Sequence, residues 1–207
     1  MSTRRLAQEQ PADFAFNAEN LDWAKKQIAK YPEGRQASAV IPLLWVAQKQ
    51  EGWLSEPAIR CVADMLDMAY IRVYEVATFY TMFNLSPVGK HLVQVCTTTP
   101  CWLRGSDDVV AACKKHIHKD QKTISEDGTF SWMEVECLGA CVNAPMVQID
   151  DDYYEDLDGP AMEAILSDLR AGKEPKTGPQ KDRVSSEPIG GATTLKDQSL
   201  YAGSGDE

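Results

Sequence analysis

Residues 91–101 read His-Leu-Val-Gln-Val-Cys-Thr-Thr-Thr-Pro-Cys, and this stretch decides how the second half of the chain is interpreted. Residues 91–95 predict a short strand, and Cys96 stands at its end. Cys101 then opens a predicted helix, which places two cysteines with four residues between them in a strand-to-helix loop. Such a loop is a place where thiols can act as ligands.

A second cysteine pair follows the next predicted strand, residues 129–136, which comes after the turn Asp127-Gly128. Three residues lie between Cys137 and Cys141, and 35 residues separate this pair from the first. Each pair leaves a predicted strand, so a small sheet can bring both loops to one edge. Four thiolates arranged in this way can hold zinc or an iron–sulfur cluster, and the spacing alone leaves both possibilities open.

The composition of the two loops favours a cluster. Residues 97–99 are three threonines, whose hydroxyls and backbone N–H groups stand close to the expected sulfurs. Such hydrogen bonds offset negative charge and tune reduction potential. Cys101 at a helix N-terminus adds a favourable dipole, and Gly139 lets backbone amides curl around the site.

The remaining two cysteines are interpreted as structural. Cys61 lies in a predicted helix, and Cys113 lies on the apolar face of another, where free thiols act as small hydrophobes. A disulfide enzyme would require a Cys-x-x-Cys segment at a helix start, which neither pair provides. His91, His116 and His118 are scattered, and no acid–base residue is assigned.

The chain of 207 residues is soluble in character, with 43% hydrophobic and 25% charged residues. Its net charge of −10 provides no basic patch for nucleic acid. We expect no transmembrane span, no secretory signal and no export signal.

The first third predicts helices. In the last of them, residues 71–83, Val73, Val76, Ala77 and Tyr80 form one apolar face, while Phe79, Met82 and Phe83 form a second. A helix that is apolar nearly all round is covered on both sides, either within its own bundle or by a partner.

The predicted order is four helices, then strand–helix–strand–strand–strand–helix, which indicates an α+β chain with a helical bundle before a small α/β domain. We divide it into an N-terminal extension (1–17), the bundle (18–86), the α/β domain (87–171) and an extended or disordered tail (172–207). The tail is rich in Gly, Pro, Ser and Lys, and could become ordered against a partner.

The segment from Val95 to Cys101 and the segment Glu136-Cys-Leu-Gly-Ala-Cys-Val-Asn-Ala-Pro145 closely resemble the thioredoxin-like [2Fe–2S] subunit of respiratory complex I, the NADH:quinone oxidoreductase. Residues 73–83 and 50–54 also resemble that family. The similarity covers roughly residues 18–170, with no departure at a ligand position.

The resemblance implies a thioredoxin-like α/β domain and one [2Fe–2S] cluster, with Cys96 and Cys101 on one iron and Cys137 and Cys141 on the other. It implies an electron-transfer role without a catalytic centre in this chain. A partner subunit would bind FMN and NADH, and other peripheral-arm subunits would lie nearby. The complex would be a quinone-reducing translocase of the respiratory chain, with this subunit on the cytoplasmic side of a bacterial inner membrane.

Three alternatives remain at this point. The equivalent small subunit of an NAD-linked hydrogenase or formate dehydrogenase shares the core motif. A zinc-stabilised interaction module would be colourless and contain no sulfide. A free ferredoxin conflicts with the two-faced aromatic helix.

Overall fold

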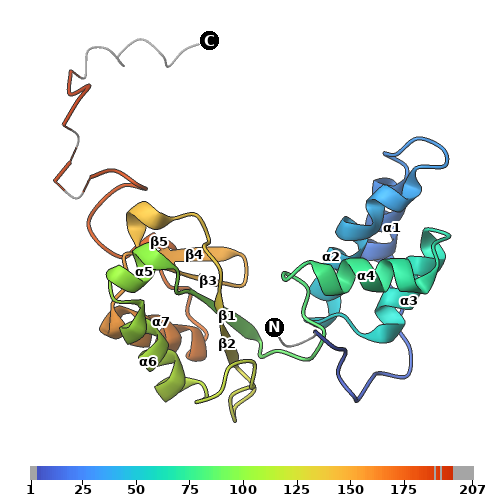
Figure 1. Ribbon diagram of the computed structural model, residues 1–207, viewed down its shortest axis with the longest axis horizontal. Coiled ribbons are helices and arrows are strands. Elements are labelled where there is room, and N and C mark those ends of the chain that lie inside the picture. The colour runs from blue at the N-terminus through green and yellow to red at the C-terminus, as the bar shows by residue number, and fades with distance from the viewer. Residues whose placement is uncertain (1–3, 189, 192, 198–207) are drawn as a thin grey trace. The chain divides into compact units, whose positions relative to one another are not determined.

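The protein is described by a computed structural model that covers residues 4–188, 190–191 and 193–197. The chain divides into two compact units at the junction between Val88 and Gly89. The first unit is helical, and the second combines helices with a sheet (Figure 1).

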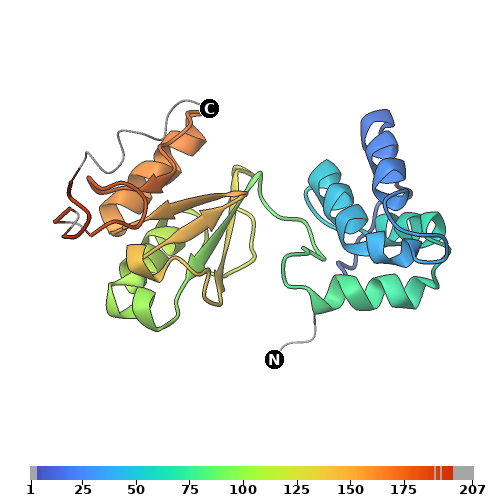
Figure 2. The ribbon, with the colours of Figure 1, turned by 90° about the horizontal axis from the view of Figure 1, so that it is seen from above.

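Packed helices make up the first unit, seen again in blue to green in Figure 2. Its elements are α1 (Ala18–Ile28), the 3-10 helix η1 (Gln36–Ala39), α2 (Val40–Glu51), α3 (Glu56–Met65) and α4 (Tyr70–Phe79). Their apolar faces share one core, which includes Leu43, Leu44, Ile59, Val62 and Val73. The predicted helical bundle is therefore present.

Local chemistry explains where these helices begin and end. The Ser55 hydroxyl accepts a hydrogen bond from the Ala58 N–H at 3.3 Å and so caps the start of α3. Gly52 ends α2 with φ of 82°, a left-handed conformation that glycine adopts without strain. At the end of α4, Arg4 donates hydrogen bonds to the carbonyls of Thr78, Tyr80 and Phe83.

Helix α4 ends at Phe79, four residues before the predicted end, because Tyr80 leaves the helical conformation. The residues of the second apolar face consequently differ in burial. Phe83 lies in the turn after the helix and is fully buried in the bundle core, whereas Phe79 is 76% exposed. The second face is therefore only partly an outward surface.

The second unit contains a sheet with the strand order β2-β1-β3-β4-β5. Its strands are β1 (His91–Cys96), β2 (Phe130–Val135), β3 (Val147–Ile149), β4 (Asp152–Glu155) and β5 (Gly178–Pro179). Strand β1 runs parallel to β2 and antiparallel to β3, and β4 pairs antiparallel with β3 and parallel with β5.

Two long helices, α6 (Ser106–His116) and α7 (Gly159–Arg170), contact each other and share one core with the sheet (Figure 1). Val93, Val95 and Trp132 from the sheet are fully buried there. Helix α7 contributes the buried side chains Met162, Ile165 and Leu166.

The single helix expected from Cys101 to Ile117 is two helices. The short α5 (Thr99–Leu103) ends before Gly105, which has φ of 99° and allows the chain to turn into α6. Glycine adopts this angle at low cost, whereas other residues do not. The break lets α5 carry Cys101 while α6 packs on the sheet.

The first part of the C-terminal segment packs against the sheet. β5 adds a fifth strand beside β4, and the Gln180 N–H donates to the Glu155 carbonyl at 3.0 Å. The predicted tail beyond residue 197 lies outside the described residues.

Gly89, at the start of the second unit, should not tolerate a side chain. A Cβ at this position would meet the backbone of Phe130, with the Phe130 carbonyl oxygen at 2.7 Å. Because strand β2 cannot move away without disturbing the sheet, we expect Gly89→Ala to lower the free energy of unfolding by about 2 kcal/mol. Denaturant unfolding measures this change.

Gly159→Ala is the matched control. A Cβ there would make only ordinary contacts, the nearest at 3.6 Å from the Asp108 carbonyl oxygen, at the first position of α7. Equal stability of the two variants would contradict the close packing of Gly89 against β2.

Candidate metal centre

The first cysteine pair is buried. Cys96 ends β1 and Cys101 lies in α5, and each is 1% exposed. The Thr98 hydroxyl lies 3.3 Å from the Cys96 sulfur. Thr97, in contrast, turns its hydroxyl to Glu134 at 3.2 Å. Of these two neighbouring threonines, Thr98 is thus the one that supports a sulfur.

The second pair is exposed. Cys137 follows β2, and Cys141 begins the 3-10 helix η2 (Cys141–Asn143). Their sulfurs are 3.5 Å apart, and the Gly139 N–H donates to the Cys137 sulfur at 3.4 Å. Gly139 has φ of 86°, which turns its amide towards the sulfur as the sequence predicts.

Parallel pairing of β1 with β2 brings both loops to one sheet edge. Cys96 is in register with Val135, two residues before Cys137. Contacts then connect the loops, since the Leu138 backbone donates to the Cys96 sulfur and the Thr98 hydroxyl also interacts with the sulfur of Cys137. The structure therefore brings all four predicted cysteines into one group.

The two thiols of each cysteine pair differ in the direction in which their pKa is shifted. Burial raises the pKa of Cys96, but hydrogen bonds from Thr98 and Leu138 outweigh it and lower that pKa overall. Burial and the neighbouring Cys96 raise the pKa of Cys101 to about 12. Hydrogen bonds from Gly139 and Cys141 lower the pKa of Cys137, while the bond to Cys137 raises that of Cys141. One thiol of each pair thus has a lowered pKa and the other a raised pKa, and bound metal ions would displace the protons of both.

The four cysteine sulfurs are arranged as two pairs. Among the residues that the structure describes, no three His, Cys, Asp or Glu side chains converge as ligands of a single ion. Two thiolates on one tetrahedral metal with bonds of about 2.3 Å lie about 3.8 Å apart, close to the 3.5 Å between Cys137 and Cys141. A centre with two metals, each taking one cysteine pair, fits this donor set.

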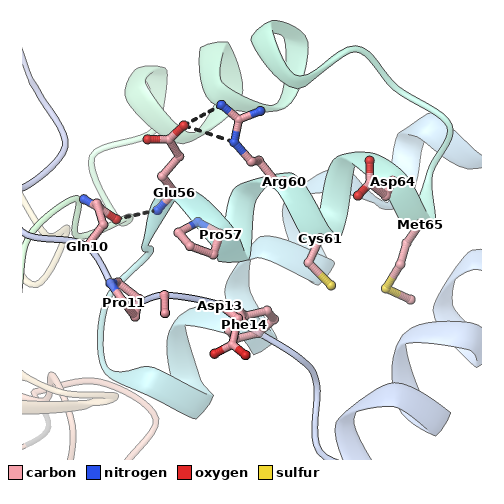
Figure 3. Close-up of a pocket in the computed structure, with 11 residues that line it drawn as sticks. Gln10, Pro11, Asp13, Phe14, Glu56, Pro57, Arg60, Cys61, Asp64 and Met65 are labelled. Atoms are coloured by element: carbon pink, nitrogen blue, oxygen red, sulfur yellow. Dashed lines mark hydrogen bonds and ion pairs between the residues drawn. The ribbon is translucent and has the colours of Figure 1, made fainter.

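The other two cysteines lie apart from this group. Cys113 is fully buried on α6, and burial raises its pKa to about 12. Cys61 is half-buried rather than enclosed. It lines an open pocket of about 640 Å³ in the helical unit, beside Pro57 and Met65 (Figure 3). Both thiols contact apolar neighbours, which agrees with a structural interpretation.

Sequence reasoning missed Tyr153, which lies on strand β4 and supports the loop of the second cysteine pair. Its hydroxyl donates to the Leu138 carbonyl at 2.9 Å, and its ring packs beside Cys96 and Cys101. A tyrosine in strand β4 carries no local pattern that relates it to a loop 15 residues earlier. Its role comes from the antiparallel pairing of β3 with β4.

A helix-covered sheet with four cysteines in two loops at one edge defines a thioredoxin-like iron–sulfur domain. A family model described as thioredoxin-like [2Fe–2S] ferredoxin matches residues 24–170. The solved structure of an NAD⁺-reducing [NiFe]-hydrogenase in the H2-reduced state has a similar fold, with a TM-score of 0.56 and 15% identity over 64% of this chain and 22% of that chain.

Curated relatives are more specific. An E subunit of NADH-quinone oxidoreductase from Rhizobium meliloti (strain 1021) is 60% identical over 95% of this chain and 73% of the relative. The corresponding E subunit of Rickettsia bellii (strain RML369-C) is 58% identical over 76% of this chain and 95% of the relative. The chain belongs to the thioredoxin-like [2Fe–2S] ferredoxin family and, within it, to the family of NADH-quinone oxidoreductase E subunits. Its cofactor is one [2Fe–2S] cluster, and the resemblance seen in the sequence is confirmed.

Proposed function

We propose that Cys96 and Cys101 hold one iron of the cluster and that Cys137 and Cys141 hold the other. The observation that carries this assignment is the meeting of two sulfur pairs at one sheet edge, in contact through Thr98 and Leu138. The cluster, when bound, supplies a site for one electron. The Thr98 hydroxyl and the Gly139 amide then offset the negative charge of the sulfurs.

The electron partner that we propose is the FMN of an NADH-oxidising subunit. Both cysteine loops expose large apolar side chains, a set that we call the apolar rim: Trp102, Leu103 and Val142 are 58%, 70% and 66% exposed. Apolar side chains gathered around a redox centre are typical of a surface that a partner covers. Burial beneath a partner would shorten the path to the flavin and exclude water from the cluster.

We also propose that this chain has no catalytic centre of its own and that the complex, not the subunit, oxidises NADH and reduces quinone. The sequence contains no Gly-x-Gly-x-x-Gly segment for a dinucleotide. Within the described part of the chain, no helix is long and apolar enough to cross a membrane. The proposed location is the cytoplasmic face of a bacterial inner membrane, as a peripheral subunit beside other peripheral-arm subunits.

Anaerobic purification of the full chain tests the electron-carrying role directly. We expect a brown protein with about two irons and two sulfides per chain, and a one-electron paramagnetic signal of spin one-half after reduction with dithionite. Iron and sulfide analysis with paramagnetic resonance provides the measurement. A colourless protein with one zinc and no sulfide would instead indicate the zinc-stabilised interaction module.

A further inference from the structure

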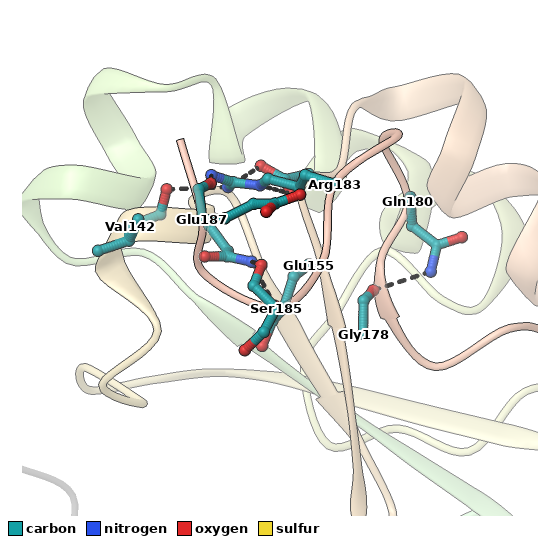
Figure 4. A network of polar contacts seen from close by, with 9 residues as sticks. Val142, Glu155, Gly178, Gln180, Arg183, Ser185 and Glu187 are labelled. Atoms are coloured by element: carbon teal, nitrogen blue, oxygen red, sulfur yellow. Dashed lines mark hydrogen bonds and ion pairs between the residues drawn. The ribbon is translucent and has the colours of Figure 1, made fainter. Parts of the chain in front are cut away.

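The segment of residues 178–187, here called the C-terminal strap, contacts the backbone of Val142 through Arg183 (Figure 4). It begins as strand β5 and continues through Arg183 and Ser185 to Glu187. Its composition predicts an extended or disordered tail. The contacts of its polar side chains connect it instead to the loop that carries a proposed ligand.

Arg183 is the centre of these contacts. Its guanidinium donates to both carboxylate oxygens of Asp156, from Nε at 2.7 Å and from Nη2 at 2.5 Å. The two side chains are only 4% and 2% exposed. The same guanidinium donates to the Val142 carbonyl and to the Glu187 carbonyl, each at 3.0 Å. A planar, five-donor group suits such convergent acceptors better than an ammonium does.

Polar contacts hold the part of the ligand loop that follows Cys141. Val142 is 66% exposed and Cys141 is exposed, so apolar burial contributes little at these two positions. Asn143 is the buried residue of η2, and its side-chain amide donates to Glu155 at 2.7 Å and to the Ser185 carbonyl at 2.8 Å. The Asp156 N–H also donates to the Asn143 carbonyl at 2.7 Å.

These hydrogen bonds form a closed network. Asp156 holds Asn143 through its backbone and Arg183 through its side chain, while Arg183 holds Val142. Asp156 itself has φ of 56°, a strained angle for a residue with a side chain, which positions the carboxylate for this pair. The strap therefore fixes both residues that follow Cys141.

We propose that Arg183 is a positioning residue for the cluster, fastening the C-terminal strap over Val142 and Asn143 and so holding Cys141 in the geometry that an iron requires. This inference rests on the proposed ligand assignment. Groups that orient metal ligands without touching the metal commonly change metal retention by about 10-fold or more. The strap would give this subunit a cluster that survives when its exposed loop is free of a partner.

The test compares the full chain with three variants, each carrying its cluster. Arg183→Met removes the tether but leaves Asp156 buried and unpaired. Arg183→Met combined with Asp156→Asn removes the tether and the unpaired charge together, so the fold is retained. Arg170→Met is the matched control, because Arg170 also binds a carboxylate, Asp127 at 2.8 Å, and a carbonyl, that of His116 at 2.9 Å.

The rate of cluster loss under excess iron chelator is followed by visible absorption, with circular dichroism to monitor the fold. We expect both Arg183 variants to lose the cluster about 10-fold faster than the wild type, with a changed paramagnetic spectrum, and Arg170→Met to match the wild type. Wild-type rates and spectra in the double variant would overturn the positioning role. A wild-type chain without two irons and two sulfides would refute the proposed function itself, independently of Arg183.

Discussion

Cys101→Ala should leave the full chain without its [2Fe–2S] cluster, reducing the iron and sulfide content by about 10-fold or more. Cys101 is buried, and its sulfur lies in the group that includes Cys96 and Cys141. Alanine removes the thiolate and offers no substitute ligand, so one iron would have a single protein ligand left. Chemical analysis of iron and sulfide, with visible absorption, measures the loss.

Cys113→Ala is the control that makes this result specific. Cys113 is buried to the same extent, and its pKa is raised by burial to about 12, as is that of Cys101. The two thiols differ in their neighbours, because Cys113 packs among apolar side chains of the α6–sheet core. We expect this variant to keep its cluster, and cluster loss in Cys113→Ala with retention in Cys101→Ala would contradict the ligand assignment.

Phe83→Ala should destabilise the helical unit strongly, by about 3–5 kcal/mol, because it leaves a cavity the size of an aromatic ring. Phe83 is fully buried beside the carbonyls that Arg4 binds. Phe79→Ala, four residues earlier, should change the free energy of unfolding by less than about 0.5 kcal/mol, because that ring is 76% exposed. Thermal or denaturant unfolding separates the two.

For assembly with partner subunits, Phe79 should matter more than Phe83, which is the reverse of their order in stability. Phe79→Glu keeps the bundle intact and places a charge on an exposed aromatic surface that includes Tyr80, whose ring centroid lies 5.1 Å from that of Phe79. If a neighbouring subunit covers this surface, Phe79→Glu weakens co-purification with the complex while the cluster content stays unchanged. Full assembly of that variant would mean that the ring is an incidental surface residue. Helical periodicity groups Phe83 with Phe79 on one face, but the chain leaves the helix at Tyr80 and Phe83 is buried in the core.

The relatives also decide between alternatives that the sequence motifs left open. Two curated E subunits, at 60% and 58% identity, place the chain in the NADH-quinone oxidoreductase rather than in a hydrogenase or formate dehydrogenase. The likeness to the hydrogenase structure shows a common fold at 15% identity. A shared domain can serve different complexes, because function resides in the site and its partners.

The sequence by itself determined the cysteine loops. Cys96, Cys101, Cys137 and Cys141 each follow a strand that could be recognised from local composition, and parallel strands carry their trailing loops to the same sheet edge. Gly139 could be recognised in a similar way, because glycine adopts a positive φ more readily than other residues do. Short-range patterns of this kind are written in neighbouring residues and need no knowledge of the rest of the chain.

Only the tertiary structure decided what supports those loops. Tyr153, on strand β4, reaches Leu138 in the loop after β2, and Arg183 reaches Asp156 and Val142 across 27 and 41 residues. A polar segment such as 178–187 has the composition of a free tail, and its order comes from buried hydrogen bonds with distant partners. Pairing over such separations depends on how strands and loops are brought together in space, so local sequence patterns do not predict it.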